Sequence, residues 1–255
     1  MDAGSLFLEG RTALVTAASR NLGAAIAAAL ARHGATVAVN YHSSSAAAES
    51  LVARLREETG REHVALRGDI GTAAGVGGLV ESALERLGRI DVLVNNAGPF
   101  SMTPFAELPE AEWDAVWDAN VKAVHVATRL VVPGMRAAGW GRIVNLSAGS
   151  AYLRNHSIYT LAKAALIVLT EQLALELGPE ITVNAVAPGQ IAESAPDIEA
   201  IDPTFVERAI AHTPAGRLAT RAEVAELVAQ LASPAFDMVT GVTLPVDGGW
   251  RVNRF

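Results

Sequence analysis

Short, continuously apolar runs alternate with helical patterns from one end of the chain to the other, and this alternation limits the fold more than any other feature. Runs such as VLV and IVNL lack the in-and-out pattern of a half-exposed strand, so they predict a parallel sheet covered on both faces. Strict alternation of strand and helix implies right-handed crossovers and a doubly wound parallel α/β sheet of about seven strands. The predicted strands are residues 13–16, 36–40, 63–67, 91–95, 142–147, 181–187 and 242–246.

The helical segments lie between these strands, and no linker, repeat or low-complexity tract divides the 255 residues. A single domain over residues 1–255 is therefore predicted. In such a sheet, ligands bind beyond the carboxyl ends of the strands, so the informative side chains should follow strands directly. The predicted helices are residues 22–32, 46–58, 72–87, 110–138, 157–177 and 221–231.

Composition excludes several classes of function. The formal net charge is −7 and the basic residues are scattered, which argues against a nucleic-acid surface. The chain has no cysteine, and its six histidines show no HxxxH or HExxH spacing, so neither thiolate chemistry nor a metal site is predicted. No apolar run approaches a membrane span and the N-terminus lacks a signal-peptide pattern, which predicts a cytoplasmic protein with no membrane contact.

Tyr159 and Lys163 are four residues apart on a predicted helix, with Ser147 upstream at the end of a predicted strand. Residues four apart share a helix face, which places an ammonium beside a phenol. A neighbouring cation favours the phenolate and brings the pKa of a tyrosine closer to the range of a general acid or base. Most Tyr-x-x-x-Lys pairs are ordinary helix surface, so the other motifs have to decide between the two interpretations.

The first predicted strand runs into TAASRNLG, which opens an alanine-rich helix. Such a turn presents backbone N–H groups and the positive end of a helix dipole to a pyrophosphate. Ala17 and Asn21 stand where a glycine-rich turn would have glycine, and only Gly23 remains. Asn21 is the least costly replacement for a left-handed backbone, whereas Ala17 is harder to accommodate.

The end of the second predicted strand indicates the cofactor. A site selective for NAD usually has Asp or Glu there, but this chain has Asn40, Tyr41, His42 and Ser43. No carboxylate repels a 2′-phosphate, and Arg20 in the preceding turn supplies a cation, with Ser43 and Asn40 as further hydrogen-bond partners. The sequence therefore predicts NADP(H) over NAD(H).

Taken together, these motifs resemble the classical short-chain dehydrogenase/reductase family over nearly the whole chain, in its 3-oxoacyl-reductase-like or pteridine-reductase-like branch. Residues 95–98 (NNAG) and 246–249 (VDGG) match family segments, and residues 188–189 match the turn beside the nicotinamide. Two departures are the TGxxxGxG turn, altered at Ala17 and Asn21, and Glu193, which stands where the family has threonine. We expect Glu193 to point outward and Ser194 to take over the hydroxyl contact.

The resemblance implies a single Rossmann-type domain and a hydride transfer between NADP(H) and a small carbonyl or alcohol substrate. It implies that Tyr159 is the general acid/base, that Lys163 lowers its pKa and binds the nicotinamide ribose, that Ser147 polarises the carbonyl, and that Asn120 holds a water. The implied catalytic residues are Asn120, Ser147, Tyr159 and Lys163. The implied cofactor-binding residues are Thr16, Ala18, Ser19, Arg20, Asn21, Leu22, Asn40, Tyr41, His42, Ser43, Asp69, Ile70, Asn96, Ala97, Gly98, Tyr159, Lys163, Pro188, Gly189 and Ile191.

Two alternatives stay open: a pteridine or other C=N reductase, and a catalytically silent NADP-binding sensor or interaction protein. The segment 190–213 is expected to cover the substrate as a lid. Leu153, Arg154 and His156 are expected to shape the pocket, and Phe100 and Met102 belong either to an apolar pocket wall or to the core. The helices predicted at 110–138 and 157–177 imply, by resemblance, a homotetramer or homodimer.

Overall fold

A computed structural model describes residues 6–96, 98–152, 157–200 and 202–252. Seven parallel strands form one sheet in the order β3-β2-β1-β4-β5-β6-β7, which confirms the predicted doubly wound fold. The chain order reverses between β1 and β4, so the switch point lies there. The strands are β1 (Thr12–Val15), β2 (Thr36–Tyr41), β3 (Val64–Arg67), β4 (Val92–Asn95), β5 (Gly141–Leu146), β6 (Ile181–Pro188) and β7 (Thr243–Val246).

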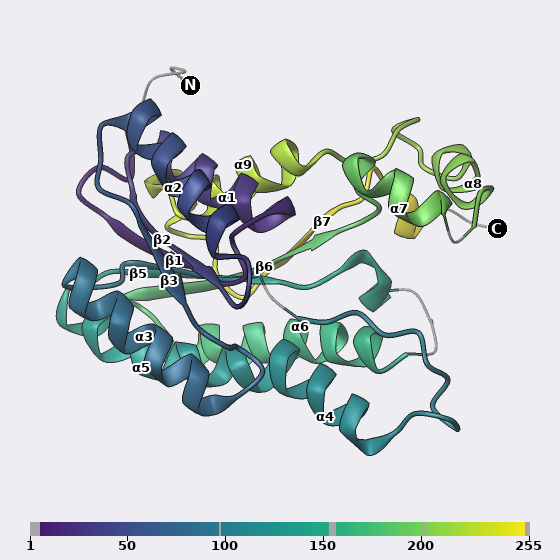
Figure 1. Cartoon of the computed structure of the whole chain (residues 1–255), viewed down its shortest axis with the longest axis horizontal. Coiled ribbons are helices and arrows are strands. Elements are labelled where there is room, and N and C mark those ends of the chain that lie inside the picture. The colour runs from purple at the N-terminus through teal and green to yellow at the C-terminus, as the bar shows by residue number, and fades with distance from the viewer. Residues whose placement is uncertain (1–5, 97, 153–156, 201, 253–255) are drawn as a thin grey trace.

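Helices cover both faces of the sheet, as Figure 1 shows. The helices α1, α2 and α9 lie on one face, whereas α3, α4, α5 and α6 lie on the other. Each face has its own apolar core, and β1 contributes to both because Val15 faces one core and Leu14 the other. The helices are α1 (Asn21–Arg32), α2 (Ser45–Thr59), α3 (Ala73–Leu87), α4 (Glu110–Trp117), α5 (Ala123–Ala137), α6 (Ile158–Leu177), α7 (Ala195–Glu199), α8 (Phe205–Ala211) and α9 (Arg221–Leu231).

The helix predicted at 110–138 is a continuous helical path with one irregular turn. A π-helical turn, Asp118–Lys122, separates α4 from α5. Such turns insert an extra residue into the helix and are frequent at functional sites. Here the π-turn carries Asn120, so the irregularity falls at a predicted catalytic position.

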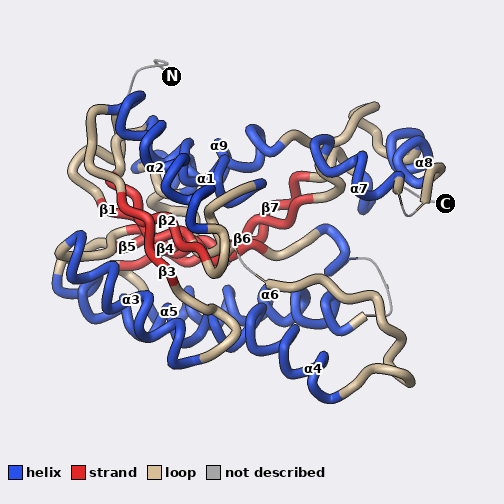
Figure 2. The backbone as a smooth tube through the Cα atoms, viewed as in Figure 1, coloured by secondary structure: helices blue, strands red, loops and turns tan. Residues whose placement is uncertain are grey.

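The segment 190–213, which is predicted to be a lid, contains short helices. It contains the 3₁₀ turn Ala192–Ser194 and the short helices α7 and α8, which project from the sheet beyond β7 (Figure 2). A small apolar cluster that includes Val206, Ala209 and Leu218 holds these helices together. A bridge between Ile191 and Ala219 closes the base of the lid.

Among the described helices, α6 has the length and apolar composition of a membrane span, contrary to the sequence-based expectation that no segment approaches one. Its buried residues pack on the sheet, with α6 contacting β5 and β6, and it carries the buried Lys163. A helix buried in a protein core has the same composition as a membrane span, because the protein interior and the membrane interior are both apolar.

Candidate active site

The carboxyl ends of the central strands meet at one edge of the sheet. Asn95 on β4 pairs in register with Asn145 on β5, and Leu146 pairs with Val186 on β6. Thr16 follows β1 and Ser147 follows β5, so the predicted polar residues converge at this edge. Parallel pairing alone produces this convergence, because every strand ends on the same side.

Ser147 and Lys163 each donate a hydrogen bond between the end of β5 and α6. The Ser147 hydroxyl donates to the backbone carbonyl of Lys163 at 2.8 Å, and the Lys163 ammonium donates to the carbonyl of Leu146 at 2.7 Å. Both side chains are buried. These two bonds fix the first turns of α6 against the strand end.

The first turn of α6 is set by its N-cap. The Ser157 hydroxyl accepts a hydrogen bond from the backbone N–H of Thr160 at 3.1 Å, which satisfies one of the free amides at the helix start. The cap fixes where the helix begins, and therefore on which face Tyr159 lies.

Tyr159 lies between Lys163 and Phe100. The Lys163 Nζ atom is 5.5 Å from the centre of the Tyr159 ring, and the Phe100 ring meets the same ring edge-on with its centroid 5.0 Å away. Burial raises the pKa of Tyr159 to about 12 and lowers the pKa of Lys163 to about 7. The pKa of Tyr159 is therefore raised by burial, whereas the resemblance implies a lowering by Lys163. The physical reason is that both groups are withdrawn from water, while the ammonium is directed at the Leu146 carbonyl.

Asn120 is fully buried in the π-turn. Its Nδ2 donates to the carbonyls of Val116 at 2.9 Å and Pro99 at 3.2 Å, so it ties the loop after β4 to the helix. Its Oδ1 has no hydrogen-bond partner among the described residues. A buried amide oxygen of this kind is costly unless a water or ligand donates to it, which fits the water-holding role that the resemblance implies.

Gly98 lies directly against this amide. Its φ is +149°, and a Cβ built on Gly98 would overlap the side chain of Asn120. Glycine at this position is therefore required by the close approach of the loop to Asn120.

The turn after β1 adopts the shape of a glycine-rich turn without the glycines. Ala17 has φ +48° and Asn21 has φ +52°, so both replacements adopt the left-handed backbone that glycine would take. Asn tolerates this conformation, whereas Ala17 pays a steric cost. Gly23 has to be glycine, since an added Cβ would lie 2.5 Å from the Ala17 carbonyl oxygen.

The start of α1 is open to an anion. Its N-cap, Arg20, makes no side-chain capping bond, and the first turn holds no acidic residue. The free amides and the positive end of the helix dipole are therefore available to a phosphate. This is the structural observation that fits a dinucleotide pyrophosphate at the predicted turn.

Asn40 and Asn96 hold this turn from two sides. Asn40 Oδ1 accepts from the Ala17 N–H at 2.9 Å, and its Nδ2 donates to the carbonyls of Leu66 and Gly68. Asn96 Nδ2 donates to the carbonyls of Thr16 and Ala17. Because Asn40 is buried with its amide committed to the backbone, it supports the turn rather than the ribose, which corrects its expected role.

The residues expected at the adenosine end lie close together. His42 Nδ1 is 3.3 Å from Asp69 Oδ1, which joins the ends of β2 and β3. Ser43 and Arg20 are exposed, and the Arg20 side chain forms no hydrogen bond or ion pair with the described part of the chain. A cation without a partner beside an uncapped helix start is suited to bind an anion.

Glu193 is held at the start of α9. Both of its carboxylate oxygens accept from the backbone N–H of Arg221, at 3.0 and 3.1 Å, at the start of α9. Ser194 Oγ accepts from the Arg221 guanidinium at 3.4 Å. The helix dipole of α9 therefore stabilises the carboxylate that replaces the family's threonine.

A buried polar chain links the sheet to α6, and of its three residues only Asn95 belongs to a sequence motif described above. Asn95 Nδ2 donates to Asn145 Oδ1 at 2.9 Å, and Asn145 Nδ2 donates to Thr170 Oγ1 at 3.0 Å. The signal in the sequence is an asparagine in each of two otherwise apolar strands, VLVN and GRIVNL. Paired asparagines in buried neighbouring strands have to satisfy each other or a third group.

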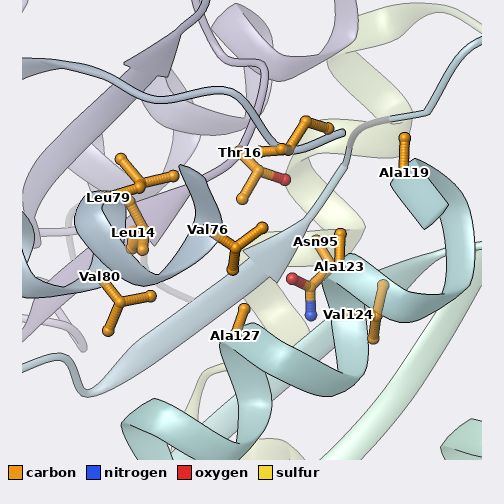
Figure 3. Close-up of a pocket in the computed structure, with 11 residues that line it drawn as sticks. Leu14, Thr16, Val76, Leu79, Val80, Asn95, Ala119, Ala123, Val124 and Ala127 are labelled. Atoms are coloured by element: carbon orange, nitrogen blue, oxygen red, sulfur yellow. The ribbon is translucent and has the colours of Figure 1, made fainter. Parts of the chain in front are cut away.

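Two cavities in the described part of the chain are lined by neither Ser147, Tyr159 nor Lys163. The first, shown in Figure 3, is enclosed between β1, β4, α3 and α5 beneath Thr16 and Asn95, with room for about 10 Å³. That is about the space of one water, so it is too small for a ligand. The second, of about 260 Å³, lies between α8 and the C-terminal segment and is lined by Phe205, Arg208, Ala209, His212 and Trp250.

Several predicted positions fall outside the described residues, namely Ala97, Leu153, Arg154 and His156. Phe100 and Met102 are described, and their exposed fractions of 66% and 63% exclude the core-packing alternative. Among described residues, no group of acidic or histidine side chains could hold a metal ion.

The chain belongs to the short-chain dehydrogenase/reductase family of oxidoreductases. The family model described as enoyl-(acyl carrier protein) reductase matches residues 16–251. A 3-oxoacyl-[acyl-carrier-protein] reductase of Synechocystis sp. is 38% identical over 246 residues, which are 95% of this chain and 97% of that protein.

Two solved structures show the same fold with cofactor bound. The gluconate 5-dehydrogenase of Burkholderia cenocepacia, in complex with NADP and tartrate, is 31% identical with a TM-score of 0.90, covering 98% of this chain and 99% of that one. A 7α-hydroxysteroid dehydrogenase, complexed with NADH and 7-oxo glycochenodeoxycholic acid, is 32% identical with a TM-score of 0.90, covering 98% of this chain and 97% of that one.

Proposed function

We propose that this protein is an NADPH-dependent reductase that transfers hydride between the nicotinamide and a carbonyl or alcohol substrate. The observation that carries the proposal is the joint placement of Ser147, Tyr159 and Lys163 at the carboxyl edge of the sheet, with β5 and α6 locked together by reciprocal hydrogen bonds. Such an edge is where doubly wound sheets bind their ligands. The filled catalytic positions argue against a silent sensor.

The chain's own residues supply positioning and proton transfer. NADPH, when bound, supplies the hydride. The amides at the start of α1 would hold its pyrophosphate, and Lys163 would donate one of its remaining N–H groups to the ribose. The Ser147 hydroxyl leaves the Lys163 carbonyl and donates to the substrate oxygen, while Tyr159 gives its proton to the same oxygen as it gains charge.

The protonation states support Tyr159 as the acid. With its pKa raised to about 12, the phenol holds its proton at neutral pH and can give it to an alkoxide. The reverse reaction, alcohol oxidation, needs the phenolate, which a protonated Lys163 favours only once bound groups draw the ammonium toward the phenol oxygen.

The preference for NADPH rests on charge. Arg20 is exposed and unpaired within the described chain, and the residues that end β2 include no carboxylate. Structural neighbours bind either NADP or NADH, so the choice depends on the chain's own residues. A guanidinium fits a 2′-phosphate, whereas NADH offers it only hydroxyls.

The deciding experiment is NADPH oxidation with a panel of ketones, aldehydes and dihydrobiopterin, in wild type and in Tyr159→Phe. We expect ketone-dependent oxidation in wild type, its loss by at least about a thousandfold in the variant, and unchanged NADPH binding by calorimetry. Turnover retained in Tyr159→Phe would refute the acid assigned here. Turnover of dihydrobiopterin alone would favour the C=N reductase.

A homotetramer in the cytoplasm completes the proposal. Leu161, Val168 and Leu175 are spaced by seven along α6 and are exposed by 42%, 56% and 82%. Seven residues are about two helical turns, so these side chains form one apolar stripe on a long helix. Such a stripe is suited to packing against a symmetry-related copy.

A further inference from the structure

The loop after β4 presents an apolar side chain next to the predicted acid. Phe100 meets the Tyr159 ring edge-on at a centroid distance of 5.0 Å with an interplanar angle of 68°, yet 66% of it is exposed. Most of this aromatic ring therefore faces open space beside the group that donates the proton. Met102, two residues further on, is exposed by 63%.

The same loop is fastened to α4 by the residues that lie between these two. Glu112 Oε1, in the first turn of α4, accepts from the Ser101 hydroxyl at 2.6 Å and from the Thr103 hydroxyl at 2.8 Å. Ser101 is buried, and its hydroxyl also accepts from the backbone N–H of Thr103 at 3.3 Å. These hydrogen bonds lower the pKa of Glu112, so the carboxylate stays charged at neutral pH and can accept both.

These two hydrogen bonds to one carboxylate oxygen orient the loop. Ser101 and Thr103 turn toward α4, whereas Phe100 lies against Tyr159 and Met102 is exposed. In an unattached loop, an exposed phenylalanine would populate many rotamers. The hydrogen-bonded loop instead holds the Phe100 ring at a defined distance from Tyr159. Phe100 is therefore held in place by the hydrogen bonds of its neighbours, unlike an isolated exposed residue.

We infer that Phe100, held by Glu112 through Ser101 and Thr103, is a substrate wall that selects ketones carrying an aryl or alicyclic ring beside the carbonyl. The inference rests on the proposed function of Tyr159. A ring attached to the carbonyl carbon lies next to the phenol when the carbonyl oxygen accepts its proton. The exposed face of Phe100 then offers stacking and dispersion contacts that a small aliphatic ketone cannot fill.

The test compares kcat/KM for acetophenone and for butanone, with NADPH, in wild type and in Phe100→Ala. We expect kcat/KM for acetophenone to fall by about tenfold or more, and that for butanone to change by less than about threefold. Phe105→Ala is the matched control, because Phe105 is an exposed phenylalanine of the same loop that contacts Trp113 rather than Tyr159. An equal change for both ketones in Phe100→Ala would overturn the inference.

Glu112 is tested as a positioning residue. We expect Glu112→Ala to reproduce the selective loss for acetophenone, since it releases both hydroxyls, and Glu112→Gln to restore most of it, since the amide oxygen still accepts. A purely structural role would lower both kcat/KM values together. Unchanged selectivity in Glu112→Ala would remove Glu112 from the wall.

Binding to a catalytically dead protein separates this inference from the proposed function. Calorimetry of acetophenone with Tyr159→Phe loaded with NADP should show binding that weakens about tenfold when Phe100→Ala is added. If wild type reduces no ketone but this binding difference is found, the wall stands and the proposed reaction fails. If wild type reduces ketones and the binding difference is absent, the wall fails and the reaction stands.

Discussion

The Ser147 hydroxyl donates a hydrogen bond of 2.8 Å to the backbone carbonyl of Lys163, while the Lys163 ammonium donates one of 2.7 Å to the carbonyl of the residue before Ser147. One bond thus runs from Ser147 to the backbone of α6, and the other runs from Lys163 to the last residue of β5, Leu146. This fixes α6 on β5 and keeps both polar groups satisfied while they are buried. The single proton of the Ser147 hydroxyl is committed by its bond, whereas the Lys163 ammonium uses only one of its three N–H groups.

The first prediction concerns the pH dependence of stability. Burial lowers the pKa of Lys163 to about 7 from an ordinary 10.5. Between these values the unfolded chain binds a proton that the folded protein does not, so the free energy of unfolding rises with pH, by up to about 1.4 kcal/mol per pH unit. Below pH 7 both states are protonated and the full cost of burying the ammonium is present.

Urea unfolding without cofactor, from pH 7 to pH 9.5, measures this rise in wild type and in Lys163→Met. The variant cannot bind the proton, so its stability should lack this rise. The raised pKa of Tyr159 affects stability only above pH 10, where the unfolded tyrosine ionises first. Identical pH profiles for the two proteins would show that Lys163 stays protonated in the folded state.

The second prediction concerns the strained turn. Ala17→Gly should raise the free energy of unfolding by about 0.5–1 kcal/mol, because relief of the left-handed strain outweighs the added freedom of the unfolded chain. Asn21→Gly should change it by less than about 0.5 kcal/mol, since asparagine tolerates this backbone. Ala18→Gly is the control. Ala18 is buried and does not have a positive φ, so glycine there should destabilise the protein.

The third prediction concerns the contact between Gly98 and Asn120. Gly98→Ala should destabilise the protein by about 1–3 kcal/mol and lower kcat by at least about tenfold, since the new methyl group displaces the Asn120 amide. Gly78→Ala on α3 is the matched substitution, because a Cβ there meets no atom within 4 Å and improves helix propensity. Thermal unfolding and steady-state kinetics would measure both effects, and wild-type kinetics in Gly98→Ala would contradict the role of Asn120.

The fourth prediction concerns cofactor choice. Arg20→Ala should lower the ratio of kcat/KM for NADPH over NADH by about ten- to a hundredfold, by removing a charge-assisted contact to the 2′-phosphate. Arg32→Ala, at the opposite end of α1, should leave the ratio unchanged. A ratio equal to wild type in Arg20→Ala would remove that residue from the phosphate site.

The fifth prediction concerns assembly. Val168→Glu and Leu175→Glu should each lower the molar mass measured by light scattering, because a charge in the stripe on α6 is costly to bury against a second copy. Met238→Glu adds the same charge at a residue exposed by 96% outside this helix and should leave the mass unchanged. A monomeric mass in wild type would show that the stripe is not an interface.

The elements were predictable where their signal is local. The strands from β1 to β7 and the helices α1, α2, α3, α6 and α9 match the predicted segments closely, because apolar runs and helical periodicity depend on neighbours in the chain. The π-turn at Asn120 and the helices α7 and α8 were not predicted. Both depend on packing against distant segments, namely the loop at Pro99 and the chain near Leu218.

The sequence by itself determined the residue types and their order. From these, a parallel sheet, a turn suited to an anion, and the placement of Ser147, Tyr159 and Lys163 after its strands could be predicted. Only the tertiary structure decided how these groups are used. Burial raises the pKa of Tyr159 and lowers that of Lys163. The side-chain amide of Asn40 forms its hydrogen bonds with the backbone of the turn and of the loop after β3. Desolvation and hydrogen-bond partners are properties of the folded surroundings, so no spacing along the chain encodes them.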